Sequence, residues 1–149
     1  MTTYYSNQQV VPGSTSQFSP RGYYNQAKKV SIDTYTAAAL AQNSIIQCWT
    51  PPANFVFTGG MLYFAALGAS TDLEVGVGAT LSGTAANATL FLGSTSTSSA
   101  GNASLEPASA SASSLLYTFD GGTPIIITVS GAGAITGLIV LRTEGYLMY

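Results

Sequence analysis

Residues 125–141 read IIITVSGAGAITGLIVL, and this stretch decides between a membrane helix and a β-fold. It lies within Gly121–Leu141, a run without a charged residue that is long enough to span a bilayer as a helix. However, its two apolar halves are rich in β-branched residues and have the length of strands, and the small residues 130–134 between them are typical of a loop. We therefore predict a β-hairpin of 125–129 and 135–141 rather than a transmembrane helix.

Short apolar runs separated by Gly, Ser, Thr or Pro continue through the whole chain from Lys28 onward. Eight or so strands of this kind predict an all-β protein, specifically an antiparallel β-sandwich (jelly-roll-like) with an extended N-terminal arm. The predicted strands are 30–35, 44–50, 55–64 (with a bulge or bend at Gly59-Gly60), 73–77, 89–92, 115–119, 125–129 and 135–142.

The segments between these runs are less regular. Asp120-Gly121-Gly122 predicts a turn, and residues 36–42 could form one or two turns of helix. Residues 93–114 are nearly all small or polar, so they predict either a long loop or plain strands at an exposed edge.

Period-two alternation identifies the candidate core. The predicted core residues are Leu73, Val75, Val77, Leu90, Leu92, Ile125, Ile127, Ile139 and Leu141. Cys48 is the single cysteine and lies in an apolar run, so we expect a buried, unreactive thiol that is dispensable for function.

Residues 1–27 differ from the rest, because Gln, Asn, Ser, Tyr, Pro and Gly dominate and aliphatic residues are scarce. We divide the chain into an extended arm (1–27) and a β-sandwich body (28–149). Such a segment cannot bury enough apolar area to order by itself, which leaves two interpretations: a simple tail, or an arm that orders against a partner. The expected partner-binding residues of the arm and its junction are Tyr4, Tyr5, Phe18, Arg21, Tyr23, Tyr24, Lys28 and Lys29.

Charge is scarce, since Lys and Arg number 4, Asp and Glu number 6, and histidine is absent. Without histidine, a serine nucleophile has no familiar base and zinc has few ligands, and so few cations are a poor basis for binding nucleic acid. Asp72 and Glu74 would share one face of a strand, where a solvated pair is the more common outcome than a catalytic or Ca²⁺-binding pair. We expect no enzyme, no cofactor, no metal site, and neither nucleic acid nor membrane as a partner.

Several segments follow one another in a characteristic order within about residues 45–146: Pro52-Ala53, Leu67 to Thr71, Val75-Gly76, Thr123 to Val129 and Gly137 to Tyr146. This order resembles that of small virion proteins of tailed bacteriophages. The resemblance implies a capsid decoration or cement protein, built as a β-sandwich and often multimeric, that binds the major capsid protein on the outer surface of the head.

The weakly charged surface also favours contact between copies, and analogy with sandwich-built virion proteins suggests a homotrimer. The alternative function is a receptor-binding or fibre-tip module of a virion that contacts host glycans.

Overall fold

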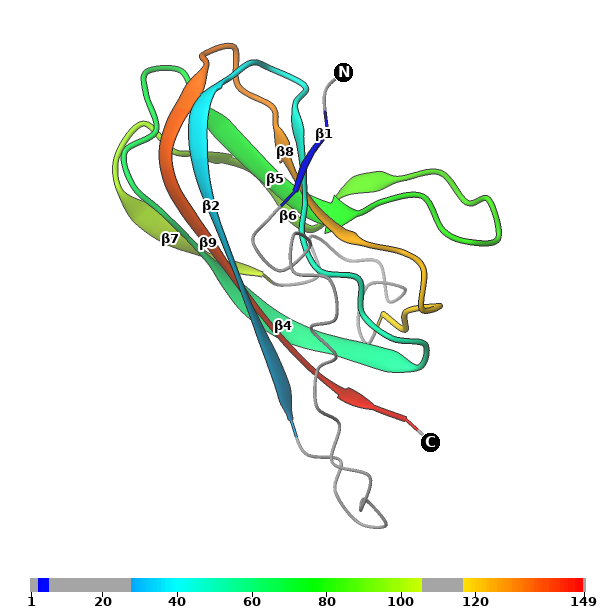
Figure 1. The fold of residues 1–149 in the computed structure, drawn as a ribbon. Coiled ribbons are helices and arrows are strands. Elements are labelled where there is room, and N and C mark those ends of the chain that lie inside the picture. The colour runs from blue at the N-terminus through cyan, green and yellow to red at the C-terminus, as the bar shows by residue number, and fades with distance from the viewer. Residues whose placement is uncertain (1–2, 6–27, 106–116, 149) are drawn as a thin grey trace.

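The computed structural model describes residues 3–5, 28–105 and 117–148, which contain strands and no helix. Two sheets pack face to face as a β-sandwich, which confirms the predicted fold class (Figure 1). Sheet A has the strand order β1-β3-β8-β5-β6, and sheet B has the order β2-β9-β4-β7. In chain order the strands are β1 (Thr3–Tyr5), β2 (Lys29–Leu40), β3 (Ile45–Gln47), β4 (Phe55–Phe64), β5 (Asp72–Val77), β6 (Asn87–Ser96), β7 (Gly101–Leu105), β8 (Ile125–Val129) and β9 (Ile135–Leu147).

The long strand β9 organises sheet B, because it pairs antiparallel with β2 on one side and with β4 on the other. Close packing at this strand requires glycine: a Cβ on Gly145 would lie 2.2 Å from the carbonyl oxygen of Val56. The register between β4 and β9 shifts between Phe57 and Gly59, so the predicted irregularity in this strand is confirmed as a β-bulge.

The predicted hairpin of 125–129 and 135–141 is wrong, although both segments are strands. Strand β8 pairs with β3 and β5 in sheet A, whereas β9 pairs with β2 and β4 in sheet B. Residues 130–134 therefore cross from one sheet to the other instead of making a tight turn. Glycine is required here because residues 130–134 pass very close to the backbone of residues 69–72. A Cβ on Gly131 would lie 2.4 Å from the Asp72 nitrogen, and a Cβ on Gly133 would lie 2.2 Å from the Ala69 oxygen.

The helical turn considered for residues 36–42 is also absent, because β2 continues as a strand to Leu40. Its pairing with β9 shifts register between Ala37 and Leu40, and Ala39 adopts a positive φ of 54° there. Both Ala37 and Leu40 are buried, so burial against the sandwich overrides the weak local preference for helix.

Residues 93–96 and 101–105 belong to strands at exposed sheet edges, which is one of the two predictions for this segment. Strand β6 is an edge of sheet A and β7 is an edge of sheet B, while residues 106–114 lie outside the described residues. The strand predicted at 115–119 is reduced to a single bridge between Thr118 and Val56 within the described residues.

Most of the predicted core is confirmed. Leu73, Val75, Val77, Ile125, Ile127, Ile139 and Leu141 are buried. Leu90 and Leu92 are only partly buried, whereas Phe91 between them is completely buried and stacks on Phe57 with ring centroids 4.0 Å apart. Strand β6 pairs with β5 through two register shifts, so a strict period-two alternation does not hold along it.

Cys48 lies in this core with 1% of its surface exposed, so the predicted burial is confirmed. Burial raises the pKa of its thiol well above the ordinary value, and the nearby Asp33 carboxylate raises it further. Within the described residues, no helix is long and apolar enough to cross a membrane.

Candidate interaction surface

The first part of strand β2 turns its apolar side chains outward and its polar side chains inward. Val30 and Ile32 are 48% and 55% exposed, whereas Ser31 and Asp33 are 8% and 2% exposed. The Ser31 hydroxyl donates a hydrogen bond to Oδ2 of Asp33 (3.4 Å), which gives the inward polar groups a partner within the sandwich. Two large apolar side chains exposed side by side on one strand are unusual for a surface that contacts only water.

The neighbouring strands continue this apolar surface. Cross-strand pairing sets Ile32 opposite Arg142 and Thr36 opposite Leu138 on β9, and sets Val140 of β9 opposite Tyr63 on β4. We call the resulting surface the apolar face of sheet B; it consists of Val30, Ile32, Met61, Tyr63, Leu138 and Val140. Among the described residues, the other strongly exposed large apolar side chains are Leu81 and Met148, which lie outside the strands.

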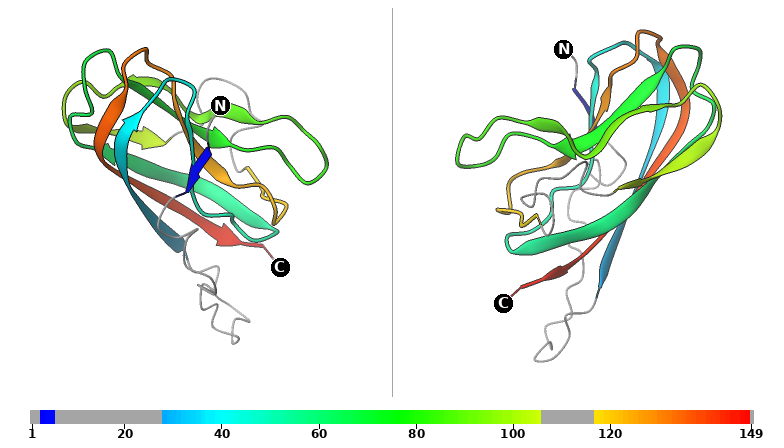
Figure 2. Two further views of the ribbon diagram at one scale, coloured as in Figure 1. Left: turned by 45° about the horizontal axis from the view of Figure 1, so that its top comes forward. Right: turned by 180° about the vertical axis from the view of Figure 1, so that it is seen from behind.

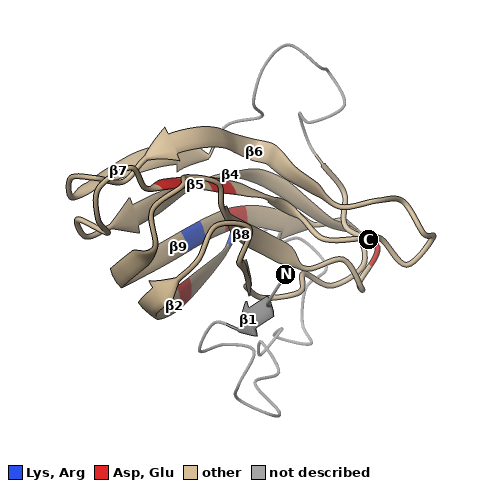
Figure 3. Ribbon diagram, turned by 90° about the horizontal axis from the view of Figure 1, so that it is seen from above, with Lys and Arg blue, Asp and Glu red and all other residues tan. Residues whose placement is uncertain are grey.

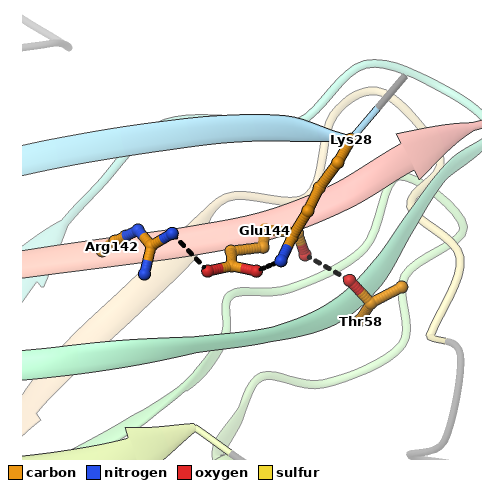
Figure 4. Close-up of polar contacts among 4 residues, drawn as sticks. All are labelled: Lys28, Thr58, Arg142 and Glu144. Atoms are coloured by element: carbon orange, nitrogen blue, oxygen red, sulfur yellow. Dashed lines mark hydrogen bonds and ion pairs between the residues drawn. The ribbon is translucent and has the colours of Figure 1, made fainter.

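An ion cluster lies on the same face. Glu144 forms ion pairs with Lys28 and with Arg142, the latter at 2.7 Å between carboxylate and guanidinium (Figure 4). Its side chain is only 12% exposed, while those of Lys28 and Arg142 are 59% and 41% exposed. The Thr58 hydroxyl donates to the Glu144 carbonyl oxygen (3.3 Å), which joins β4 to β9 at this point. Two cations against one anion give the cluster a net charge of +1.

The opposite side of the sandwich is acidic. Leu73 and Val75 of β5 point into the core, so Asp72 and Glu74, which alternate with them, lie on the outer face of sheet A. Figure 3 shows the acidic segments in red, including those at β5, and the basic segment of β9 in blue. The predicted sharing of one face by these carboxylates is confirmed. Neither side chain forms an ion pair within the described residues.

The described cations belong to sheet B or adjoin it. Lys28 precedes β2, Lys29 begins it and Arg142 lies on β9. The described part of the molecule is therefore electrically polarised from one sheet to the other.

The arm residues named from the sequence are only partly described. Tyr4 and Tyr5 belong to β1, which pairs in parallel with β3 of the same chain opposite Ile46 and Gln47. Lys28 belongs to the ion cluster. The remaining predicted residues of the arm, Phe18, Arg21, Tyr23 and Tyr24, lie outside the described residues.

Asp120 anchors the loop between β5 and β6, which projects from the sandwich (Figure 2). Its carboxylate accepts hydrogen bonds from the backbone amides of Gly122 (2.9 Å), Thr123 (2.8 Å) and Leu81 (2.9 Å). These bonds hold the pKa of Asp120 well below its usual value, with the Gly122 amide making the largest contribution. The predicted turn at 120–122 is thus confirmed, and the role of Asp120 in it is structural.

No group of three or more Cys, Asp and Glu side chains that could hold a metal ion occurs in the ranges that the structure describes. The sequence reasoning missed the apolar face of sheet B. The alternation of Val30, Ser31, Ile32 and Asp33 indicates a strand with two different faces, but it does not indicate which face lies inward.

No family model matches the sequence, and no curated protein matches it. The fold does match solved structures. One is a chain in the capsid of Ralstonia phage GP4, with 18% identity and a TM-score of 0.64 over 91% of this chain and 94% of that chain. Another is a chain in the capsid asymmetric unit of cyanophage Pam1, with 18% identity and a TM-score of 0.60 over 93% of this chain and 100% of that chain. The two-sheet fold of this chain therefore also occurs, at nearly full length, in chains of two phage capsid structures.

Proposed function

We propose that this chain is a non-catalytic structural virion protein of a tailed bacteriophage, and specifically a capsid decoration or cement protein. In this role it binds the major capsid protein on the outer surface of the head and reinforces the shell. The observation that carries the proposal is the fold similarity to chains of two phage capsid structures over nearly the whole length of each chain.

The surface chemistry supports a role inside an assembly. Only 7% of the residues are charged, against roughly 25% in ordinary soluble domains. The apolar face of sheet B adds a patch of exposed large side chains that would be buried by a partner. A surface with little charge repulsion and an uncovered apolar patch is suited to permanent contacts.

We assign attachment to the capsid to the arm, through Tyr4, Tyr5, Phe18, Arg21, Tyr23, Tyr24 and Lys29, with Lys28 at the junction. Aromatic side chains supply large contact area at low entropic cost, and the basic residues add a weaker attraction to an acidic site. Because Lys28 is paired with Glu144 in the fold, its contribution to capsid binding is secondary to that of the aromatic residues. The body associates with copies of itself, as a homotrimer by analogy with other sandwich-built virion proteins.

Reconstitution tests this function. Purified protein is added to phage heads that lack it, and the bound protein per major capsid protein is measured together with resistance of the heads to heating. Saturable binding at a fixed ratio with increased resistance is the expected result. Heads that bind none of the protein would refute a decoration role, and binding to host surface glycans instead would support a receptor-binding module.

A further inference from the structure

We propose that the apolar face of sheet B is a second capsid-binding surface, which lies against an apolar site of the shell that has a carboxylate beside it. This inference rests on the proposed function and extends it, because it adds a surface of the body to the contacts assigned to the arm. In this arrangement the body lies with sheet B toward the shell and sheet A away from it.

The apolar face of sheet B runs across three neighbouring strands, because the register places its residues side by side. Ile32 of β2, Arg142 of β9 and Met61 of β4 form one row across the sheet, and Tyr63 lies on the same side of β4. Ile32 is 55% exposed and Tyr63 is 42% exposed. Removing such side chains from water is the main source of free energy in protein association, so this face has the chemistry of a contact surface.

The charges on this face indicate what its partner offers. The side chains of Lys28 and Arg142 are 59% and 41% exposed and that of Glu144 is 12% exposed, so the face presents its cations and shields its acid. Arg142 lies between Ile32 and Met61, so a partner that covers these two residues also covers the guanidinium. One guanidinium nitrogen binds Glu144, and the remaining donors need acceptors once water is excluded. A carboxylate of the partner supplies them through charge-assisted hydrogen bonds.

The arm joins the body beside the same face. Lys28 directly follows the arm (residues 1–27) in the sequence, and its ammonium group pairs with Glu144 next to Arg142 (Figure 4). A shell that is bound by the arm is therefore held close to the apolar face. The second contact then forms at a high effective concentration, so two weak contacts together give firm attachment.

The opposite side of the sandwich is less available to a partner. Ile126 points outward from β8, since Ile125 and Ile127 lie in the core, yet it is only 4% exposed. At the end of β5, a Cβ on Gly76 would lie 1.9 Å from the Asn87 oxygen, so the chain itself passes over this strand. The outer face of sheet A is thus partly covered, whereas large apolar side chains are exposed on the outer face of sheet B.

Titration of phage heads that lack the protein with the full-length chain tests the proposal. The Ile32→Ser/Leu138→Ser variant removes apolar area from the face, and we expect it to bind about tenfold or more weakly. The matched control is Leu81→Ser, which removes a 73% exposed leucine from the loop between β5 and β6 and should bind as the unmodified protein does. Circular dichroism confirms that each variant retains its β-structure.

Salt dependence tests the carboxylate of the partner. Added salt should weaken head binding of the unmodified protein more than that of Arg142→Gln, because the variant has lost one of the exposed cations. Equal salt dependence of the two proteins would contradict a carboxylate opposite Arg142.

A photo-crosslinking amino acid in place of Tyr63 identifies what covers the face. On decorated heads we expect cross-links from this position to the major capsid protein, and none from the same amino acid in place of Leu81. Cross-links from the Tyr63 position to another copy of this chain, or no cross-link at all, would overturn the proposal. Head binding by Ile32→Ser/Leu138→Ser equal to that of the unmodified protein would also overturn it. These results leave the decoration role intact, whereas an unmodified protein that binds no heads would refute that role and this inference with it.

Discussion

Trp49 donates a hydrogen bond from its indole nitrogen to the hydroxyl of Thr143 (2.9 Å), and this bond joins the two layers of the sandwich. Trp49 follows β3 of sheet A, and Thr143 lies on β9 of sheet B with its side chain fully buried. Directly across the sheet from Thr143 is Ser31, one of the polar residues that β2 turns inward. The exposed apolar face of sheet B is thus the outer side of strands whose inner side contains a small polar network.

Replacing Thr143 by Val should destabilise the fold by about 1–3 kcal/mol, because the partly buried indole N–H loses its acceptor while the side-chain volume is kept. Urea unfolding followed by circular dichroism measures the change. In a Trp49→Phe background the same substitution should cost much less, since no donor is then left unpaired. Equal costs in the two backgrounds would show that the hydrogen bond is not what Thr143 contributes.

Phe91→Ala should cost about 3–5 kcal/mol in free energy of unfolding, because Phe91 is fully buried and stacked on Phe57. Leu92→Ala is the matched control on the adjacent, partly buried position and should cost clearly less. Denaturant unfolding of the two variants gives the comparison. A larger loss for Leu92→Ala would mean that β6 turns its other face inward.

Stability should depend on the ionisation of Asp120. Its pKa is lowered in the folded protein, so the carboxylate stabilises the fold above its ordinary pKa of about 3.9, and this contribution is lost as the pH falls below that value. The difference in unfolding free energy between the unmodified protein and Asp120→Ala should therefore be greatest at neutral pH and shrink on acidification. Asp72→Ala, which alters a carboxylate on the outer face of sheet A, serves as the control. A difference that stays constant from neutral to acid pH would contradict the assignment.

Deletion of residues 1–27 should leave the body folded and greatly reduce its occupancy on phage heads. The deletion removes only the short edge strand β1 from sheet A and leaves the core between the other strands, whereas it takes away the capsid contacts assigned to the arm. Circular dichroism monitors the fold, and quantitative gel analysis of washed heads monitors occupancy. Full occupancy by the truncated protein would show that the body surface, not the arm, is adhesive.

The sequence was sufficient to predict strands and the sandwich, because β-branched runs bounded by Gly and Pro are a local property. It was insufficient to pair them: residues 125–129 and 135–141 look like a hairpin, but the glycines between them pack against the chain at Ala69–Asp72 as it crosses between sheets. Which strand neighbours which depends on such distant contacts, and a local pattern contains no information about them.

The apolar face of sheet B could not be predicted from the sequence for a related reason. Alternation in β2 predicts two faces, and the apolar residues Val30 and Ile32 would ordinarily be placed in the core. The structure instead buries Ser31 and Asp33, because their polar groups find partners between the sheets. Only the structure of both faces shows that Val30 and Ile32 remain uncovered.

Location on the virion tests the central claim most directly. A cryo-electron microscopy map of the native particle, with the fold of residues 28–105 and 117–148 fitted into density, identifies where the chain lies and how many copies are present. The account predicts β-sandwich density repeated across the outer surface of the head and contacting the major capsid protein. Density for this fold only at a tail fibre tip, or its absence from the head, would contradict the account.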